Sequence, residues 1–429
     1  MMAKLQSVDV FTPSDFPAHT YVARDEEKLE NQLRQALATP GEVISISGPS
    51  KSGKTVLVEK VVGRDNLIII TGAGIESPEL LWDRVLDWMD IPSSTSTTTT
   101  TERSRDLSAT VEGELSIPLV GKGSLEGGIR GGLSRSTTSA SAAERRGLPQ
   151  VLKEIAGSDF VLLIDDFHYM NRDVQAEVAM QIKEAARLHT KICTASVPHR
   201  ADDVVRSNPE LRGRVRAIDI DYWKPPQLKQ IAFLGFNLLN AGIPEAAVTR
   251  FAEEASGSPQ LMQAICLQAC FELSLREELS LPTPYNVPPD TINLILRETS
   301  SRTDFASLVR NMHAGPKTRG TERKDFQFRD GTRGDVYRCV LLAVASDPPS
   351  LSLDYNELTD KIRRVCTDET PQPTSVYQAC GQVSRMALDM YPAQRVIEWD
   401  EGYSLLDIID PYFLFYIRWS GKLASLASP

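Results

Sequence analysis

The chain has 429 residues, of which 41% are hydrophobic and 24% are charged, and its formal net charge at pH 7 is −10. This composition is typical of a soluble globular protein, and the length exceeds what one ordinary core holds, so we expect two to four domains. The negative charge disfavours a protein that coats nucleic acid nonspecifically, although a single basic face remains compatible with it.

Three apolar runs in the first half of the chain predict strands of a parallel sheet. Residues 42–47 form a short run that ends at a glycine, and residues 160–164 are purely apolar. A third run at 191–197 follows a helix-like stretch at 172–189. Purely apolar runs are typical of central parallel strands, and strands that alternate with helices indicate a doubly wound sheet.

The segment after the first predicted strand has the spacing of a phosphate-binding loop. Residues 48–55 read GPSKSGKT, fit the pattern GxxxxGK[ST], and precede a predicted helix. The glycines Gly48 and Gly53 let backbone N–H groups surround phosphates. Lys54 is expected to reach the β- and γ-phosphates, and Thr55 to offer its hydroxyl to Mg²⁺. The sequence therefore predicts a Mg-ATP site, whose other loop members are Ser50, Ser52 and Val56.

Two acids follow the strand at 160–164. Asp165 stands at the end of the buried strand, where it can hold Mg²⁺ through water, and Asp166 can orient or deprotonate the attacking water. Adjacent carboxylates at the end of a hydrophobic strand are costly without a cation. We therefore predict Asp165 as a metal-site residue, together with Thr55, and Asp166 as a catalytic residue.

These two motifs, with the segments around them, resemble the AAA+ and STAND groups of P-loop ATPases. Before the loop, residues 21–24 read YVAR and resemble the adenine-side motif of that group, with Ala23 in place of the usual glycine. The resemblance implies that Tyr21, Val22 and Arg24 contact the nucleotide.

Two segments after the second acid carry the same resemblance. Residues 194–200 resemble the sensor 1 strand, which implies a catalytic role for Ser196. Residues 208–215 resemble the segment that holds the arginine finger. This resemblance implies that Arg214, or next Arg212, reaches the γ-phosphate of a neighbouring subunit and stabilises charge in the transition state.

A third segment, Gly257-Ser258-Pro259, opens a predicted helix and resembles the GxP motif of STAND proteins. The resemblance implies that Pro259 contacts the nucleotide base, although proline is also ordinary in a first helical turn. The start of this helix has no arginine, so a sensor 2 residue is absent. Its absence favours a nucleotide-gated switch over a fast motor.

The second half of the chain predicts helices and one hairpin. Apolar residues recur at helical spacing after residue 223, and three helices at 335–345, 355–366 and 373–388 precede a hairpin that turns at Glu401-Gly402. Three helices and a hairpin predict a winged helix. The segment 410–419 resembles a motif that follows the winged helix in archaeal-type, origin-recognition-like ATPases.

We therefore predict an α/β fold with several domains. The expected parts are a P-loop parallel-sheet domain at 1–222, a helical lid at 223–285, a connector at 286–334 with one helical stretch near 289–312, and a winged helix at 335–429. Between residues 320 and 429 there are 12 Lys/Arg and 16 Asp/Glu residues. Because phosphate contacts supply most nonspecific DNA affinity, we favour protein contact or intramolecular docking over DNA for this unit.

An insertion at 93–146 interrupts the P-loop domain with serine- and threonine-rich flanks. Within it, residues 107–119 and 125–133 place mainly apolar residues and glycines at odd positions and mainly polar residues at even ones. This alternation predicts an amphipathic β-hairpin over 107–135. One hairpin cannot bury its apolar face alone, so packing on the domain, contact in an oligomer and membrane entry stay open.

The preferred interpretation is an ATP-hydrolysing molecular switch of AAA+/STAND type, in defence or regulation. We expect ATP or ADP and Mg²⁺ as ligands, a nucleotide-dependent homo-oligomer and a protein partner. A DNA-binding ATPase regulator and a membrane-perforating effector are the alternatives. The first residues lack the apolar run of a signal peptide, the six cysteines show no paired CxxC spacing, and we expect a cytoplasmic protein.

Overall fold

The computed structural model describes residues 4–24, 28–91, 94–95, 143–144, 147–197, 208–317, 323–392 and 394–426. The hairpin predicted at 107–135 lies outside these residues, so the structure does not test it. At the base of the insertion, two short strands, β3 (Ser94–Thr95) and β4 (Ala143–Glu144), pair in antiparallel orientation.

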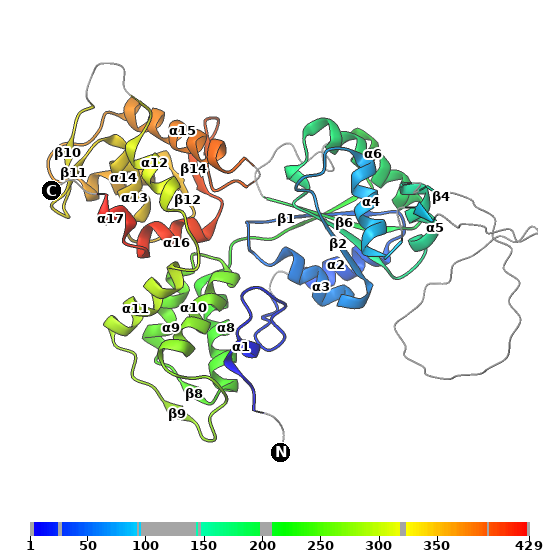
Figure 1. Cartoon of the computed structure of the whole chain (residues 1–429), viewed down its shortest axis with the longest axis horizontal. Helices are drawn as coiled ribbons and strands as arrows, with labels where there is room; N and C mark the ends of the chain where they lie inside the picture. The colour runs from blue at the N-terminus through cyan, green and yellow to red at the C-terminus, as the bar shows by residue number, and fades with distance from the viewer. Residues whose placement is uncertain are drawn as a thin grey trace, which may run out of the picture.

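Among the described residues, five parallel strands form the central sheet in the order β2-β5-β6-β1-β7, which gives the α/β fold of a P-loop protein (Figure 1). Three of them lie where apolar runs predicted strands. The strands are β1 (Val43–Ser47), β2 (Leu67–Thr71), β5 (Val161–Asp165), β6 (Lys191–Ser196) and β7 (Val215–Asp219).

Side chains alternate between the two faces of the sheet, and each face has its own helices. Val43 packs in one core, whereas Ile44 and Ile46 pack in the other. The first core includes α4 (Pro78–Trp88), α5 (Leu148–Ile155) and α6 (Arg172–Arg187); the second includes α2 (Leu29–Ala38) and α3 (Lys54–Val62). Both faces are thus covered, as the apolar strands require. Short 3₁₀ turns lie at η2 (Arg64–Asn66), η3 (Phe167–Tyr169) and η4 (Pro209–Leu211).

A helical unit follows the sheet, and Figure 1 shows it below the C-terminal unit, with the sheet unit to one side. Its helices are α8 (Pro225–Leu238), α9 (Glu245–Glu254), α10 (Pro259–Glu272) and α11 (Pro289–Ser300), and a short parallel pair joins β8 (Ala241–Gly242) to β9 (Thr283–Pro284). Cys266 and Cys270 are buried in its core, as expected of packing thiols.

The first residues of the chain pack on this helical unit, although the sequence groups them with the sheet. The short helix α1 (Ser7–Val10) precedes Phe11, whose ring lies 5.0 Å from that of Phe236 in α8. Gly235 makes this approach possible, because a Cβ there would stand 2.3 Å from the Phe11 ring. The chain then returns to the sheet at α2.

The stretch 286–334, expected to hold one helix, contains two. The helices α11 and α12 (Ala306–Ala314) are separated at Ser301–Phe305, and both contribute to the large core of the helical and C-terminal units. The hydroxyls of Thr299 and Ser300 donate to the carbonyls of Ile295 and Arg297 in the last turn of α11. Such side-chain bonds to the backbone compete with helix continuation.

Within the described residues, the C-terminal unit has five helices and a three-stranded antiparallel sheet, and three of these helices and the strand pair β13–β14 lie where the sequence predicted three helices and a hairpin. The sheet order is β12-β14-β13. Its elements are α13 (Val336–Ala345), β12 (Ser352–Asp354), α14 (Tyr355–Val365), α15 (Pro373–Met390), β13 (Ile397–Asp400), β14 (Leu405–Ile408), α16 (Pro411–Trp419) and α17 (Lys422–Ser425), with a small pair β10 (Phe326–Gln327) and β11 (Arg333–Gly334) before them.

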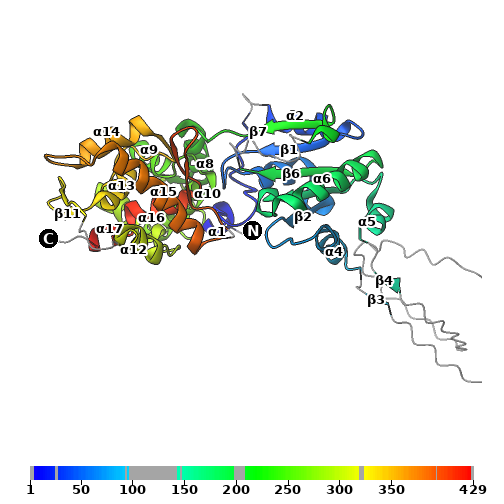
Figure 2. The same ribbon diagram turned by 90° about the horizontal axis from the view of Figure 1, so that it is seen from above.

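Seen from above, the sheet unit stands apart from the other two, which lie against each other (Figure 2). A single hydrophobic core runs through the helical and C-terminal units, whereas the sheet has its own two cores. None of the helices in the described ranges combines the length and hydrophobicity that crossing a bilayer requires.

Candidate functional site

The loop at 48–55 opens onto a cavity of about 1010 Å³ between the sheet unit and the other two units. Loop residues from Ser50 to Val56 line one part of its wall. Gly53 has a φ of 92°, which only glycine adopts without strain, and α3 begins at the next residue. Gly48 does not line the cavity, but a glycine is required at this position because a Cβ there would lie 2.9 Å from Ile220.

Lys54 is a buried cation in the wall of this cavity, with 7% of its surface exposed. Its Nζ donates to the carbonyls of Gly48 at 2.9 Å and Pro49 at 2.8 Å. Burial lowers the pKa of Lys54, and the nearby Asp165 and Asp166 act in the opposite direction. The ammonium thus sits inside the phosphate loop with two acids close enough to influence it, where an anionic ligand gains most from it.

Thr55 and Asp165, the two residues predicted for the metal site, lie in contact. The Thr55 hydroxyl donates to Asp165 Oδ2 at 2.6 Å, across the start of α3 and the end of β5. Among the described residues, no group of three or more His, Cys, Asp or Glu side chains could hold a metal. Mg²⁺ does not need one, because it keeps several waters and binds through one or two protein oxygens together with substrate phosphates. The hydroxyl and the carboxylate therefore fit this ion.

Asp166 follows in a left-handed backbone conformation, with a φ of 54°. Burial, and next the charge of Asp165, raise the pKa of Asp166 to about 6, against the opposing effect of Lys54. The end of β2 approaches this residue closely: a Cβ on Gly72 would stand 2.6 Å from the Asp166 carbonyl oxygen. Asp166 is thus a partly buried carboxylate that can accept a proton near neutral pH.

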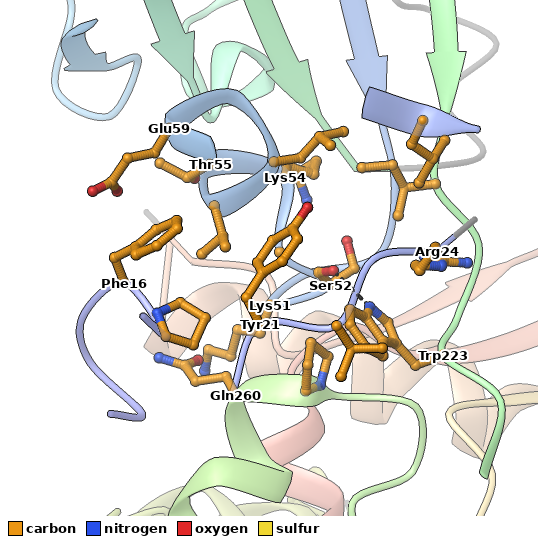
Figure 3. Close-up of a pocket in the computed structure, with 18 of the residues that line it drawn as sticks. Phe16, Tyr21, Arg24, Lys51, Ser52, Lys54, Thr55, Glu59, Trp223 and Gln260 are labelled. Carbon is orange, nitrogen blue, oxygen red and sulfur yellow. Dashed lines mark hydrogen bonds between the residues drawn. The ribbon is translucent and has the colours of Figure 1, made fainter. Parts of the chain in front are cut away.

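The four residues expected on the adenine side also line the cavity. Tyr21 donates from its hydroxyl to Glu30 at 3.0 Å, and Val22 is buried. Arg24 donates to the Asp221 carbonyl at 2.9 Å. Figure 3 shows Tyr21 between the loop residues and the start of α10, where Pro259 lies.

Three predicted catalytic residues lie outside the cavity. Ser196 is buried at the end of β6, where its carbonyl accepts from the N–H of Gly48 at 3.2 Å. Arg212 and Arg214 are exposed, and the Arg214 carbonyl accepts from the N–H of Val43, the first residue of β1. The phosphate loop follows the other end of β1, so neither arginine serves this chain's own cavity.

Sequence reasoning missed several residues that close the cavity from the far units. Trp223 donates from its indole to the Ser52 carbonyl at 2.9 Å. Lys51, in the middle of the loop, pairs with Asp410 at the start of α16, and Gln394 also bonds Asp410. These partners stand between 171 and 359 positions from the loop, and no local pattern could have linked them.

Comparison with solved structures finds distant similarity. The chain is similar to Cdc6p from Pyrobaculum aerophilum, with 14% identity, coverage of 99% of both chains and a TM-score of 0.43. It is also similar to a Walker-type ATPase of Pyrococcus abyssi, with 12% identity, coverage of 93% of this chain and 96% of that chain, and a TM-score of 0.47.

A third similarity is to the RuvB Holliday junction branch migration motor of Thermotoga maritima, with 12% identity, coverage of 69% of this chain and 79% of that chain, and a TM-score of 0.39. No family model and no curated protein matches the chain. The geometry of the phosphate loop, rather than these distant similarities, defines the site.

Proposed function

We propose that this chain is an ATP-binding and hydrolysing switch in which the nucleotide controls the position of the C-terminal unit. The observation that carries the proposal is the ion pair between the phosphate loop and α16. Lys51 Nζ lies 2.7 Å from Asp410 Oδ1, and the Asp410 side chain is only 3% exposed. The same ammonium lies 4.4 Å from the centroid of the Tyr412 ring.

This ion pair makes the loop sensitive to phosphate charge. A triphosphate held by the loop places negative charge beside Lys51 and competes with Asp410 for the same ammonium. Coupling of two equilibria is reciprocal, so whatever weakens the Lys51–Asp410 pair also strengthens triphosphate binding. ATP would thus favour release of the C-terminal unit, and hydrolysis would let it return.

The chain's own residues have distinct roles in this hydrolysis. Lys54 would hold the phosphate oxygens, and Thr55 and Asp165 would hold Mg²⁺, which would neutralise charge on the phosphates. Asp166, with its pKa raised to about 6, orients the attacking water and accepts its proton. Ser196 holds the start of the phosphate loop through its carbonyl, and an arginine from a neighbouring subunit, Arg214 or Arg212, completes the site in an oligomer.

The C-terminal unit is proposed to be a winged helix that binds protein rather than DNA. Arg363, a candidate phosphate contact, is already paired with Asp360 at 2.6 Å, and the third helix, α15, carries Arg385 as its one basic residue. A salt-dependent affinity for duplex DNA would contradict this part of the proposal.

The variant Asp410→Asn tests the switch. Asparagine keeps the capping acceptor that Asp410 offers to the Tyr412 N–H, so α16 keeps its start, but the charge that holds Lys51 is gone. We expect an affinity for ATP about tenfold higher, within the usual range of coupling energies, and a larger radius of gyration in X-ray scattering. Asp360→Asn, which removes an exposed acid in the same unit, is the matched control and should change neither value.

Unchanged ATP affinity together with unchanged dimensions in Asp410→Asn would contradict the switch. Loss of ATP binding in this variant would also contradict it, because Asp410 opposes the triphosphate in the proposed scheme. Sedimentation with ADP and with a slow ATP analogue should show whether release is followed by self-assembly.

A further inference from the structure

The β2–α4 loop (residues 72–77) lies against the backbone of Asp166. The Gly72 N–H donates to the Asp165 carbonyl at 2.7 Å. A Cβ on Gly72 would stand 2.6 Å from the Asp166 carbonyl oxygen and 3.2 Å from both the Asp166 carbonyl carbon and the Phe167 Cα. No side chain fits between the loop and this peptide, so a shift of the loop displaces the catalytic acid as well.

The backbone of Asp166 needs such support. Its φ of 54° belongs to the left-handed region, which a residue with a side chain adopts only where its surroundings hold it. The Asp166 N–H donates to Asp165 Oδ1 at 2.9 Å, and the Asp166 carbonyl accepts from the Tyr169 N–H at 2.9 Å. These bonds stay within residues 165–169, whereas the contact with Gly72 joins this turn to β2. The direction in which the Asp166 side chain leaves the backbone therefore depends on the β2–α4 loop.

Arg84 fixes the β2–α4 loop from α4, the helix that packs against β2 (Figure 2). Its Nη1 donates to the carbonyls of Thr71 at 3.3 Å and Ala73 at 3.0 Å, and its Nη2 donates to the carbonyl of Gly74 at 3.2 Å. A guanidinium offers five N–H donors in a rigid plane, which suits three carbonyls on one tight loop. Arg84 is not among the residues that line the cavity, so it acts on Asp166 through the loop and does not touch a nucleotide there.

We infer that Arg84 is a positioning residue for ATP hydrolysis, because through the β2–α4 loop it holds Asp166 where that carboxylate can orient the attacking water. The inference rests on the proposed function, which gives Asp166 this role. In the reaction the water oxygen bonds to the γ-phosphorus, the bond from this phosphorus to the oxygen of the departing ADP breaks, and Asp166 receives the water proton. The carboxylate must stay within hydrogen-bond distance of the water, and a displacement of about 1 Å can cost about 100-fold in rate.

Two substitutions displace the acid without altering it. Gly72→Ala places a methyl group where no space exists and should lower the single-turnover rate of ATP hydrolysis about 100-fold. Arg84→Met keeps an unbranched side chain but removes its donors. It should lower the rate about tenfold, because Ile75, which is buried in a core of the sheet unit, still anchors the loop. In Arg84→Lys the ammonium can still donate to these carbonyls, so part of the rate should return. The affinity of the full chain for Mg-ATP should stay at the wild-type value in all three variants.

Hydrogen exchange in the nucleotide-free protein supplies a measurement that does not depend on activity. Arg84→Met should speed the exchange of the Gly72 and Tyr169 amide protons, which bond the carbonyls of Asp165 and Asp166. Arg187→Met is the matched control, because Arg187 is exposed in the last turn of α6, on the same face of the sheet, and does not line the cavity. This control should change neither the exchange nor the rate of hydrolysis.

A double-variant comparison separates positioning from general support of the fold. If Arg84 acts on hydrolysis through Asp166, adding Arg84→Met to Asp166→Asn should slow hydrolysis no further, since the group that Arg84 positions is already gone. An arginine that only stabilises the fold would lower the rate by the same factor in both backgrounds, and this result would overturn the inference.

The remaining outcomes distinguish the inference from the function on which it rests. A wild-type rate in either Gly72→Ala or Arg84→Met would overturn the inference alone. The same follows from a loss of Mg-ATP affinity as large as the loss of rate, or from unchanged exchange at Gly72 and Tyr169 in Arg84→Met. A wild-type chain that binds ATP but does not hydrolyse it would overturn the proposed function, and the inference with it.

Discussion

Replacing Glu254 with glutamine tests how the helical unit and the C-terminal unit are held together. Glu254 ends α9, and its side chain is fully buried. Both of its oxygens accept from Arg418 of α16, at 2.7 and 2.9 Å, and Oε2 also accepts from the Trp419 indole at 2.7 Å. Arg250 approaches the same carboxylate at 2.8 Å. One buried charge thus joins two units.

The stability that Glu254→Gln loses depends on the buried charge that the substitution leaves without its partner. Arg418 is 6% exposed, and among the residues that the structure describes it would keep only Asp347, which is 68% exposed, as a charged partner. Breaking a buried pair by removing one partner costs about 3–5 kcal/mol, because the other charge stays buried. Since glutamine still offers an acceptor to Trp419, we expect about 3 kcal/mol for Glu254→Gln. Asp347→Asn, which removes the exposed partner of the same arginine, should cost about 0–1 kcal/mol.

Urea unfolding of the full chain, followed by tryptophan fluorescence, measures both losses. The double variant Glu254→Gln with Arg418→Met should lose less free energy of unfolding than the two single variants lose in sum, because it removes both members of the ion pair. Equal losses in Glu254→Gln and Asp347→Asn, or strict additivity in the double variant, would refute the reasoning that a buried uncompensated charge dominates.

Three further predictions concern the cavity. Lys54→Ala should abolish ATP binding in a titration, because the buried cation on the phosphates is lost, whereas Asp166→Asn should bind ATP and hydrolyse it slowly. Free of nucleotide and metal, Asp166→Asn should be about 1–3 kcal/mol more stable than the wild type at pH 7.5, and this difference should shrink as the pH falls and vanish below the unfolded-state pKa of 3.8. The raised pKa of Asp166, about 6, means that its ionisation lowers stability as pH rises from 4 to 6, and partial exposure favours the lower value. Arg214→Ala should slow hydrolysis without weakening ATP binding, and mixing it with Lys54→Ala should restore some activity. If Arg214→Ala hydrolyses ATP at the wild-type rate, Arg212 becomes the candidate for the arginine finger.

The phosphate loop of the site could be predicted because its residues are close in sequence and its conformation depends on local geometry. Residues 48–55 must follow a strand and precede a helix, and both flanking elements are visible as apolar runs. Thr55 and Asp165 then meet because β1 and β5 are parallel strands that end at the same edge of the sheet.

The far side of the site could not be predicted in this way. Lys51 and Trp223 look like ordinary surface and boundary residues, and their roles arise from partners far along the chain. The same reason explains the first residues: Phe11 belongs to the helical unit through Phe236 and Gly235, a tertiary contact that no periodicity reveals.

The distribution of cores suggests which parts move when the nucleotide changes. The helical and C-terminal units share one hydrophobic core and the buried Glu254–Arg418 pair, and separating them would expose both. None of the described strands and helices of the sheet unit contributes a residue to that core. The sheet unit meets the other units at polar contacts around the phosphate loop, such as Lys51–Asp410 and Trp223–Ser52. Breaking polar contacts of this kind costs much less free energy than exposing a shared hydrophobic core, because water replaces the lost hydrogen bonds. On the proposed function, the helical unit and the C-terminal unit therefore move together as one rigid body relative to the sheet unit. The Lys51–Asp410 ion pair determines when this movement occurs.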